Sequence, residues 1–201
     1  MAQASPFIVV SGNIAAGKST LLRRIAPVLG VPAYPERVEQ NPFFAAPSAD
    51  SFATEVWFLS DSAATHREIQ RGARGGVQER SVFEHVPVFG RARARFGWLR
   101  QAELGMLERL AELLAEGLAA PDLLVYMEAS AGAVAERIAS RGRAEEEGLE
   151  IGYLALIGEL YDELVDRWCL SPVYRLDTTR LDVREDGAFQ LVSREITTRL
   201  P

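Results

Sequence analysis

The chain has 201 residues, of which 48% are hydrophobic and 25% are charged, and its formal net charge is −6. This length and composition predict one globular domain, residues 1–201, with a sizeable core. The acidic balance argues against nucleic acid as a partner, since nucleic-acid binders usually present a basic face. The single Cys169 excludes an internal disulfide. The opening apolar run FIVV is far too short for a membrane span or a signal peptide, so we expect a cytoplasmic protein without a membrane partner.

Strand-like runs alternate with helical patterns along the chain. Strands that alternate with helices predict an α/β fold, in which a parallel five-stranded sheet is covered by helices on both faces. The expected strands cover residues 6–10, 31–36, 76–80, 122–128 and 172–178.

The segment SGNIAAGKST directly follows the first predicted strand. Its spacing, Gly12-x-x-x-x-Gly17-Lys18-Ser19, is the phosphate-binding loop pattern between a strand and a helix. Glycines let the backbone turn its N–H groups toward an anion, and the following helix adds the positive end of its dipole. We expect Lys18 to reach the β- and γ-phosphates and Ser19 to hold Mg²⁺. The alternative is a glycine turn capped by Ser19 or Thr20. The predicted ATP-binding loop is Gly12, Asn13, Ile14, Ala15, Ala16, Gly17, Lys18, Ser19 and Thr20.

Two acidic residues end predicted strands, Glu36 the second and Glu79 the third. In an α/β sheet, ligands gather at the carboxyl ends of the strands, so both acids are expected near the phosphate loop. A small-molecule kinase needs a carboxylate there to take the acceptor's proton. Each acid alone could equally be a solvated surface carboxylate. An ATPase using Glu128, at the end of the fourth strand, is a further alternative, whereas the Asn-Lys-x-Asp motif of a guanine-nucleotide switch is absent from the sequence.

Two long helical patterns lie at 50–71 and 97–118. In the first, Phe52, Val56, Leu59 and Ala63 recur at helical spacing. The apolar face of the second is wider than one sheet contact requires, which is compatible with core packing or with a dimer interface. We favour the dimer, because two long helices in succession have little sheet to cover. The second pattern has one stripe of Leu99, Met106, Leu110 and Leu113, with Leu104, Leu107, Leu114 and Leu118 beside it.

An arginine-rich segment, ERIASRGRAEEEG, follows the fourth strand. Arg137 and Arg141 lie four residues apart on one helix face, and Arg143 comes after Gly142. Gly142 and Gly148 bracket a short charged stretch, so the pattern predicts a lid at about 137–148 that closes over ATP. Arginine suits this task because its planar fork binds phosphate in a bidentate manner. The alternative is a salt-bridged, exposed helix end.

In this order, GNIAAGKST, PERVEQNP, ERS and RIASRGRAEEEG resemble the deoxynucleoside kinases, over about residues 6–180. The resemblance implies a P-loop NTPase-type fold and 5′-phosphorylation of a deoxyribonucleoside by ATP and Mg²⁺. It also implies a dimer, formed with a second copy or with a paralogue. By similarity, Glu36 is the general base, Arg80 holds that base and the incoming phosphoryl group, and Glu79 lies near Mg²⁺.

The resemblance also implies roles for the lid. Arg137, Arg141 and Arg143 are similar to the family's lid arginines, with Arg141 and Arg143 catalytic and Arg137 at ATP. Glu146 is similar to the lid acid that touches the sugar 3′-hydroxyl.

The nucleoside pocket departs from the family pattern at four positions. Phe44 stands in the segment where a tyrosine is common, Glu55 replaces a glutamine, Ser62 an arginine and His85 an aspartate. An ionised Glu55 can only accept hydrogen bonds, and guanine offers two neighbouring donors on one edge. Ser62 removes a cation that would neutralise Glu55, and His85 partly replaces it.

These departures favour deoxyguanosine as the acceptor, with deoxyinosine tolerated. Three other interpretations stay open. Glu55 could be turned to solvent and read nothing. The chain could be a nucleotide-binding partner subunit with a regulatory role. It could also be a kinase of another small hydroxyl compound.

Overall fold

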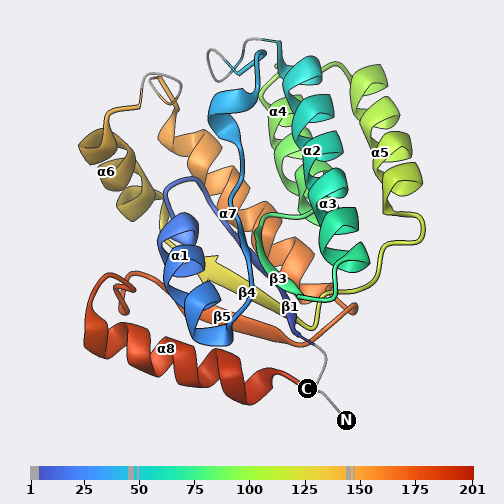
Figure 1. The fold of residues 1–201 in the computed structure, drawn as a ribbon. Helices are drawn as coiled ribbons and strands as arrows, with labels where there is room; N and C mark the ends of the chain where they lie inside the picture. Colours follow the sequence, from blue (N-terminus) through green and yellow to red (C-terminus); the bar gives the residue numbers. More distant parts are fainter. Residues whose placement is uncertain (1–4, 45–47, 49, 144–145, 147) are drawn as a thin grey trace.

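The computed structural model describes residues 5–44, 48, 50–143, 146 and 148–201 (Figure 1). Its centre is a sheet of five strands in the order β2-β3-β1-β4-β5, and every pairing is parallel. The predicted α/β architecture with a five-stranded parallel sheet is therefore confirmed. The strands are β1 (Phe7–Gly12), β2 (Ala33–Tyr34), β3 (Gly76–Glu79), β4 (Leu123–Glu128) and β5 (Val173–Asp177).

The central strand β1 positions the phosphate loop. All its residues are buried, and it pairs with β3 on one side and β4 on the other. Val10 lies opposite Glu79, and Gly12 lies opposite Met127. The carboxyl ends of three neighbouring strands thus meet where the chain leaves β1.

Strand β2 is shorter than the predicted 31–36. It covers only Ala33–Tyr34, between Pro32 and Pro35. A proline has no N–H to donate to a strand pair, so the two prolines limit the length of this edge strand. Glu36 consequently lies beyond the end of the strand and not within it.

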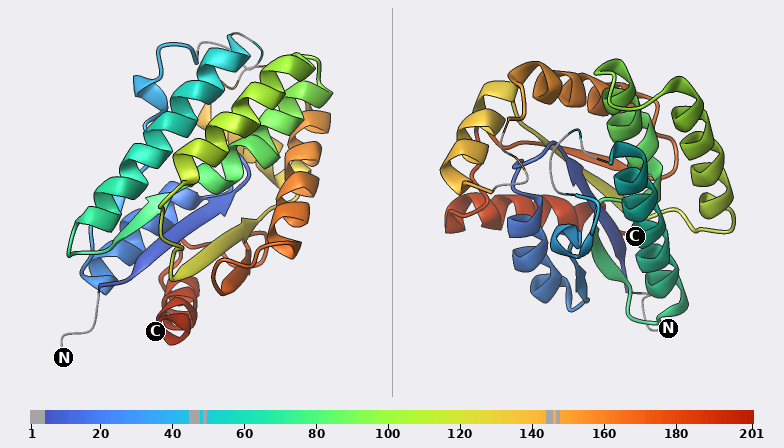
Figure 2. Two further views of the ribbon diagram at one scale, coloured as in Figure 1. Left: turned by 90° about the vertical axis from the view of Figure 1, so that its right-hand side faces the viewer. Right: turned by 90° about the horizontal axis from the view of Figure 1, so that it is seen from above.

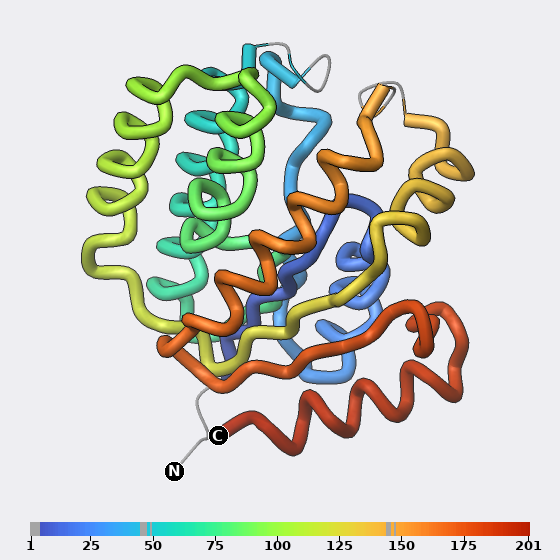
Figure 3. The backbone as a smooth tube through the Cα atoms, turned by 180° about the vertical axis from the view of Figure 1, so that it is seen from behind, coloured from blue at the N-terminus to red at the C-terminus, as the bar shows by residue number. Residues whose placement is uncertain are grey.

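Helices cover both faces of the sheet (Figures 1 and 2). On one face, α1 (Lys18–Leu29) and α8 (Asp186–Arg199) pack against the side chains of Ile8, Val10 and their neighbours. On the other face, α7 (Ile151–Asp166) packs with Val9, Leu124 and Tyr126. Figure 3 shows α7 lying diagonally across this face, with α6 (Ala131–Arg141) beside it.

Beyond this face, α2 (Ser51–Arg71) and α5 (Gln101–Ala115) lie side by side as a third layer (Figure 2). Their shared cluster includes Leu59 and Ala63 of α2 with Leu104 and Leu107 of α5. Between them and the sheet run three short segments: α3 (Val82–Glu84), the π-helical turn η2 (His85–Gly90) and α4 (Arg91–Arg95). One 3-10 turn, η1 (Val38–Gln40), precedes α2.

The structure divides the apolar residues predicted for 97–118 between a buried and an exposed side, and Leu99 lies outside the helix. Leu99 is buried ahead of α5, whereas Met106 is 62% exposed and Leu113 is 56% exposed. The buried face is centred on Leu104 and Leu107, because α5 packs on α2 and needs no second subunit to cover that face. No helix in the described ranges is both long and apolar enough to cross a membrane.

Candidate active site

The phosphate loop requires glycine at two positions. Gly12 has a φ of 144°, and a Cβ there would lie 2.6 Å from the Met127 backbone oxygen. Gly17 caps the start of α1 with a φ of 99°. Both values lie where residues with a side chain rarely go. The two glycines of the motif are therefore required by the backbone conformation of the loop.

Lys18 and Asn13 bind the loop together. The buried Lys18 Nζ donates to the Asn13 carbonyl oxygen at 2.8 Å, and burial lowers the pKa of Lys18 to about 8. Asn13 Nδ2 donates to the Leu154 carbonyl oxygen of α7 at 2.8 Å. The loop is thus tied both to itself and to α7, with a cation at its centre.

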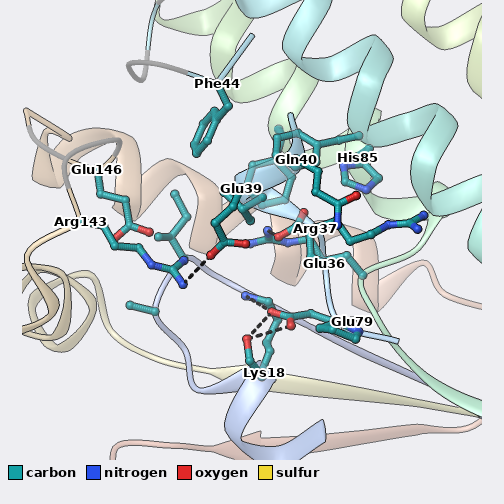
Figure 4. A pocket seen from close by; sticks show the side chains of 18 of the residues that line it. Lys18, Glu36, Arg37, Glu39, Gln40, Phe44, Glu79, His85, Arg143 and Glu146 are labelled. Carbon is teal, nitrogen blue, oxygen red and sulfur yellow. Dashed lines mark hydrogen bonds and ion pairs between the residues drawn. The ribbon is translucent and has the colours of Figure 1, made fainter. Parts of the chain in front are cut away.

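Ser19 and Glu79 are hydrogen-bonded to each other beside Lys18, and Figure 4 shows Glu79 next to Lys18. The Ser19 hydroxyl donates to Glu79 Oε1 at 3.0 Å and Oε2 at 2.8 Å. Mg²⁺ is commonly held by one or two protein oxygens together with substrate phosphates. Among the described residues no cluster of three or more His, Cys, Asp or Glu could hold a metal. The Ser19 hydroxyl and the Glu79 carboxylate are oxygen donors of the kind that would fit Mg²⁺ together with phosphate oxygens.

Glu36 and Arg80 form a nearly buried ion pair. Arg80 Nη1 donates to Glu36 Oε2 at 2.5 Å, and the guanidinium lies 4.4 Å from the centre of the Phe89 ring. Burial raises the pKa of Glu36 to about 7, against the opposing effect of the Arg80 charge. A carboxylate with a pKa near neutrality suits the acceptance of a proton from a hydroxyl group.

This pair opens into a cavity of about 310 Å³, which lies in the range of ligand pockets. Figure 4 shows Glu36 between Lys18 and Glu79 on one side and Phe44 and His85 on the other. The cavity lining combines charged and aromatic side chains. Among them are Lys18, Glu36, Glu55, Arg80, Arg93, Phe44, Phe58, His85, Phe89 and Tyr153.

Glu55 lines the cavity and is paired with Arg93 of α4. Arg93 Nε donates to Glu55 Oε1 at 2.8 Å, and Arg93 Nη1 donates to Ser51 Oγ at 3.0 Å. Glu55 is 2% exposed and Arg93 is 4% exposed, so Glu55 is not turned to solvent. Glu55 Oε2 is buried and has no hydrogen-bond partner among the described residues. The expectation that Ser62 leaves Glu55 without an arginine is therefore wrong, because Arg93 supplies the cation from another helix.

His85 does not act as a substitute cation. It is buried, and it stacks on Phe58 at 6.0 Å between ring centres with an interplanar angle of 4°. Burial and the nearby Arg80 charge lower the pKa of His85 to about 3, so the imidazole is neutral at physiological pH. The expected partial replacement of the arginine by His85 is therefore wrong.

Ser62 and Phe44 differ in their relation to the cavity. Ser62 Oγ donates to the Leu59 carbonyl oxygen at 3.0 Å, and within the described ranges Ser62 is not part of the cavity lining. Phe44 does line it, in an edge contact with Phe58 at 5.6 Å between ring centres. Position 44 thus offers an aromatic surface to a ligand.

The three arginines of the predicted lid, Arg137, Arg141 and Arg143, border a second cleft of about 360 Å³ next to the phosphate loop. Arg137 donates to the Thr178 carbonyl oxygen at 2.7 Å. Arg141 is paired with Glu146, and Arg143 Nη2 lies 3.3 Å from Glu39 Oε1 (Figure 4). Residues 144, 145 and 147 of the predicted lid lie outside the described residues. The cleft is cationic, as a site for a triphosphate should be.

The model of the deoxynucleoside kinase family matches residues 8–200. The chain belongs to the deoxynucleoside kinase family. It is 31% identical to the deoxyadenosine kinase of Dictyostelium discoideum over 175 residues, which are 85% of this chain and 71% of that protein. It is 28% identical to the deoxyguanosine kinase of Bacillus subtilis over 158 residues, which are 75% of this chain and 73% of that protein.

A solved structure of the deoxyadenosine kinase from M. mycoides with bound dATP is similar in fold. The TM-score is 0.81 at 21% identity, and the match covers 94% of this chain and 98% of the other. The P-loop NTPase-type fold expected from the sequence is thereby confirmed. The family members similar to this chain include kinases named for deoxyadenosine, deoxycytidine and deoxyguanosine.

For this member of the family, sequence reasoning did not assign site roles to Arg93, Glu84 and Tyr161. Arg93 belongs to the visible arginine cluster RARAR, which indicates charge but no partner. Glu84 completes a Ser-x-x-Glu capping box with Ser81, a pattern that is visible in the sequence. Tyr161 has no local signal, because its role depends on how α7 packs on the sheet.

Glu128 is the last residue of β4. Its carboxylate is paired with Arg175 at 2.9 Å, and among the described residues it lines neither of the two clefts beside the loop. The alternative of an ATPase that uses Glu128 therefore has no support from the geometry.

Proposed function

We propose that the chain transfers the γ-phosphoryl group of ATP, with Mg²⁺, to the 5′-hydroxyl of a deoxyribonucleoside. The observation that carries the proposal is the nearly buried Glu36–Arg80 pair between the phosphate loop and the cavity. Membership of the deoxynucleoside kinase family supports the same reaction.

In this mechanism, Glu36 accepts the proton of the acceptor hydroxyl as the oxygen attacks the γ-phosphorus, and ADP leaves as the bond from the γ-phosphorus to the bridging oxygen breaks. Arg80 holds the Glu36 carboxylate and offers its remaining N–H groups to the incoming phosphoryl group. The phosphate loop and Lys18 hold the β- and γ-phosphates. Ser19 and Glu79 would hold Mg²⁺, which neutralises charge on the phosphates when it is bound.

The segment 137–148 acts as the lid in this proposal. Arg141 and Arg143 are each paired with a carboxylate, Glu146 and Glu39. The phosphates of ATP would compete for both guanidinium groups, because phosphate is the more highly charged partner. Glu146, once released, would be available to the sugar 3′-hydroxyl. Arg137 would contact ATP beside Thr178.

Deoxyguanosine is the acceptor that we favour. Guanine offers two hydrogen-bond donors to the Glu55 carboxylate. The Oε2 atom of Glu55 is buried without a partner among the described residues. The carbonyl O6 of guanine could accept a hydrogen bond from a nearby arginine. Deoxyadenosine is the second candidate, because an Arg93 beside Glu55 could donate to a ring nitrogen while Glu55 accepts from the amino group. Phe44 and Phe58, which both line the cavity, would offer aromatic surface to the base.

A dimer is part of the proposal. Met106 and Leu113 are exposed one above the other on the outer side of α5, where a second copy or a paralogue could cover them. Their exposure supports the dimer, although the inner face of α5 is covered by α2. A cytoplasmic location stays a prediction.

The test is incubation of the purified chain with ATP, Mg²⁺ and each of the four deoxynucleosides, with the monophosphates measured by mass spectrometry. We expect dGMP to form with the highest kcat/KM. A chain that binds ATP but phosphorylates no nucleoside would instead be a regulatory partner subunit. A preference for deoxycytidine or thymidine would refute the interpretation of Glu55.

A further inference from the structure

Glu84 is a buried carboxylate that the proposed chemistry does not use. It is 1% exposed and lies in α3, shortly after Arg80. Its Oε1 accepts hydrogen bonds from the Ser81 backbone N–H and the Ser11 hydroxyl, both at 2.7 Å. Its Oε2 accepts from the Tyr161 hydroxyl at 2.6 Å. With donors on both oxygens, the ionised form of Glu84 is well satisfied.

Tyr161 links this carboxylate to Arg80. The Tyr161 hydroxyl donates to Glu84 and accepts from Arg80 Nε at 3.5 Å. A hydroxyl group has one proton, and because that proton points to Glu84, the lone pairs are left to face the guanidinium. Glu84 therefore fixes the rotation of the Tyr161 hydroxyl in the sense that suits Arg80.

The Arg80 side chain depends on such contacts. Its backbone has a φ of 61°, a left-handed conformation that residues with a side chain rarely adopt. Besides Tyr161, the guanidinium contacts the Phe89 ring, Glu36 and, at 3.4 Å, the Gly12 carbonyl oxygen. A strained residue keeps one arrangement only when the surroundings hold it there.

We propose that Tyr161 and Glu84 are positioning residues, which hold the Arg80 guanidinium against Glu36 during phosphoryl transfer. The proposal rests on the proposed function, in which Glu36 is the base. Within the described ranges neither Tyr161 nor Glu84 lines the cavity, so both act through Arg80. A guanidinium that is held in place keeps the Glu36 carboxylate oriented toward the acceptor hydroxyl.

The surroundings of Glu36 give the sign of the expected pH effect. Burial raises the pKa of Glu36, and Arg80 is the strongest opposing charge. A looser contact between Arg80 and Glu36 therefore raises the pKa of Glu36, so that Glu36 becomes protonated at a higher pH as the pH falls. His85 and Asp61 border a small neighbouring cavity, but His85 is neutral and Asp61 is paired with Arg37. The other charged groups that act on Glu36 are Lys18, Glu79 and Glu84.

Tyr161→Phe removes only the hydroxyl group. We expect kcat to fall about tenfold, because the hydrogen bond that holds the Arg80 guanidinium is lost together with the one to Glu84, with the KM for ATP unchanged. The acidic limb of the pH profile of kcat should move to higher pH. The matched control is Tyr126→Phe, since Tyr126 stacks on Tyr161 at 5.5 Å and its hydroxyl donates to Asp162. The control should keep both kcat and the acidic limb.

Glu84→Gln tests the link between the two residues. The new amide would donate to the Tyr161 oxygen and occupy the lone pair that faces Arg80, so kcat should again fall. If Glu84 acts through Tyr161, the double variant has about the same kcat as Tyr161→Phe alone. Losses that multiply in the double variant would overturn the proposed relay.

A titration of the Glu36 side-chain carboxyl by carbon-13 NMR gives a readout without turnover, with the signal assigned by its absence in Glu36→Gln. We expect the Glu36 midpoint at a higher pH in Tyr161→Phe than in the wild type and Tyr126→Phe. If the wild type phosphorylates a nucleoside while the midpoint and kcat of Tyr161→Phe are unchanged, positioning is refuted and the proposed function stands. If the wild type phosphorylates none, the proposed function is refuted, and the titration alone decides the positioning role.

Discussion

At the scale of single residues, the site depends on two carboxylates in different surroundings. Glu36 is paired with Arg80 beside the phosphate loop, whereas Glu55 is paired with Arg93 in the same cavity. Burial raises the pKa of both carboxyl groups. In our proposal, the first carboxylate accepts a proton and the second reads the base.

Glu36→Gln keeps the size of the side chain but cannot accept the proton. We expect turnover to fall about 10²–10⁴-fold, with ATP binding nearly unchanged. In the wild type, kcat/KM should fall as the pH drops below about 7, because Glu36 then takes up a proton and is no longer a base. Steady-state kinetics over a pH series measure both effects. Turnover of the variant within threefold of the wild type would remove Glu36 from this role.

Glu55→Gln replaces a group that only accepts hydrogen bonds by one that donates and accepts. The ratio of kcat/KM for deoxyguanosine to that for deoxyadenosine should fall about 10–100-fold, since a polar group of the site would no longer match guanine. The control is Ser60→Ala, an exposed position on the same helix. An unchanged ratio in Glu55→Gln would mean that Glu55 does not read the base.

At the scale of elements, the two clefts meet at the phosphate loop and the end of α6. Lys18, Ser19, Arg141 and Arg143 line both. The donor and acceptor substrates would therefore share the same cations. Closure of the segment after α6 would act on both substrates at once.

Arg141→Lys keeps the charge and loses the planar fork. We expect kcat to fall about tenfold, a larger change than the change in substrate affinity. The reason is that the contact between Arg141 and the phosphoryl group should strengthen as charge develops in the transition state. Arg199→Lys on α8, where Arg199 is paired with Glu195, is the matched control. A change in the KM for ATP alone would make Arg141 a ground-state phosphate contact.

At the scale of the whole molecule, α5 is the outermost helix of the third layer and carries Met106 and Leu113 on its exposed side. Exposed apolar side chains on one helix face suit an interface between subunits.

We expect sedimentation at twice the chain mass of 22.1 kDa at micromolar concentration. Met106→Glu combined with Leu113→Glu should shift the chain toward the monomer, because charges would be buried at the interface. Leu191→Glu, at an exposed leucine of α8, should leave the mass unchanged. A wild-type chain that sediments as a monomer would contradict the homodimer and leave the pairing with a paralogue to be tested.

The sequence by itself determined those features whose structure depends on residues close together in the chain. The phosphate loop is visible because its glycines, Lys18 and Ser19 are required by one continuous turn of backbone. The five strands are visible because buried parallel strands are apolar runs between helices. The second strand was predicted too long, at 31–36, although the prolines that limit β2 to Ala33–Tyr34 are local features of the sequence.

Only the tertiary structure decided which distant residues pair. Arg93 is 38 residues from Glu55, and Tyr161 is 77 residues from Glu84. No spacing rule joins such positions, because their contact depends on how α4 lies against α2 and how α7 crosses the sheet. The sequence shows that position 62 is a serine where the family has an arginine. Only the structure shows that Arg93, from another helix, pairs with Glu55 instead. The base-reading end of the pocket was therefore the part that sequence reasoning could describe least well.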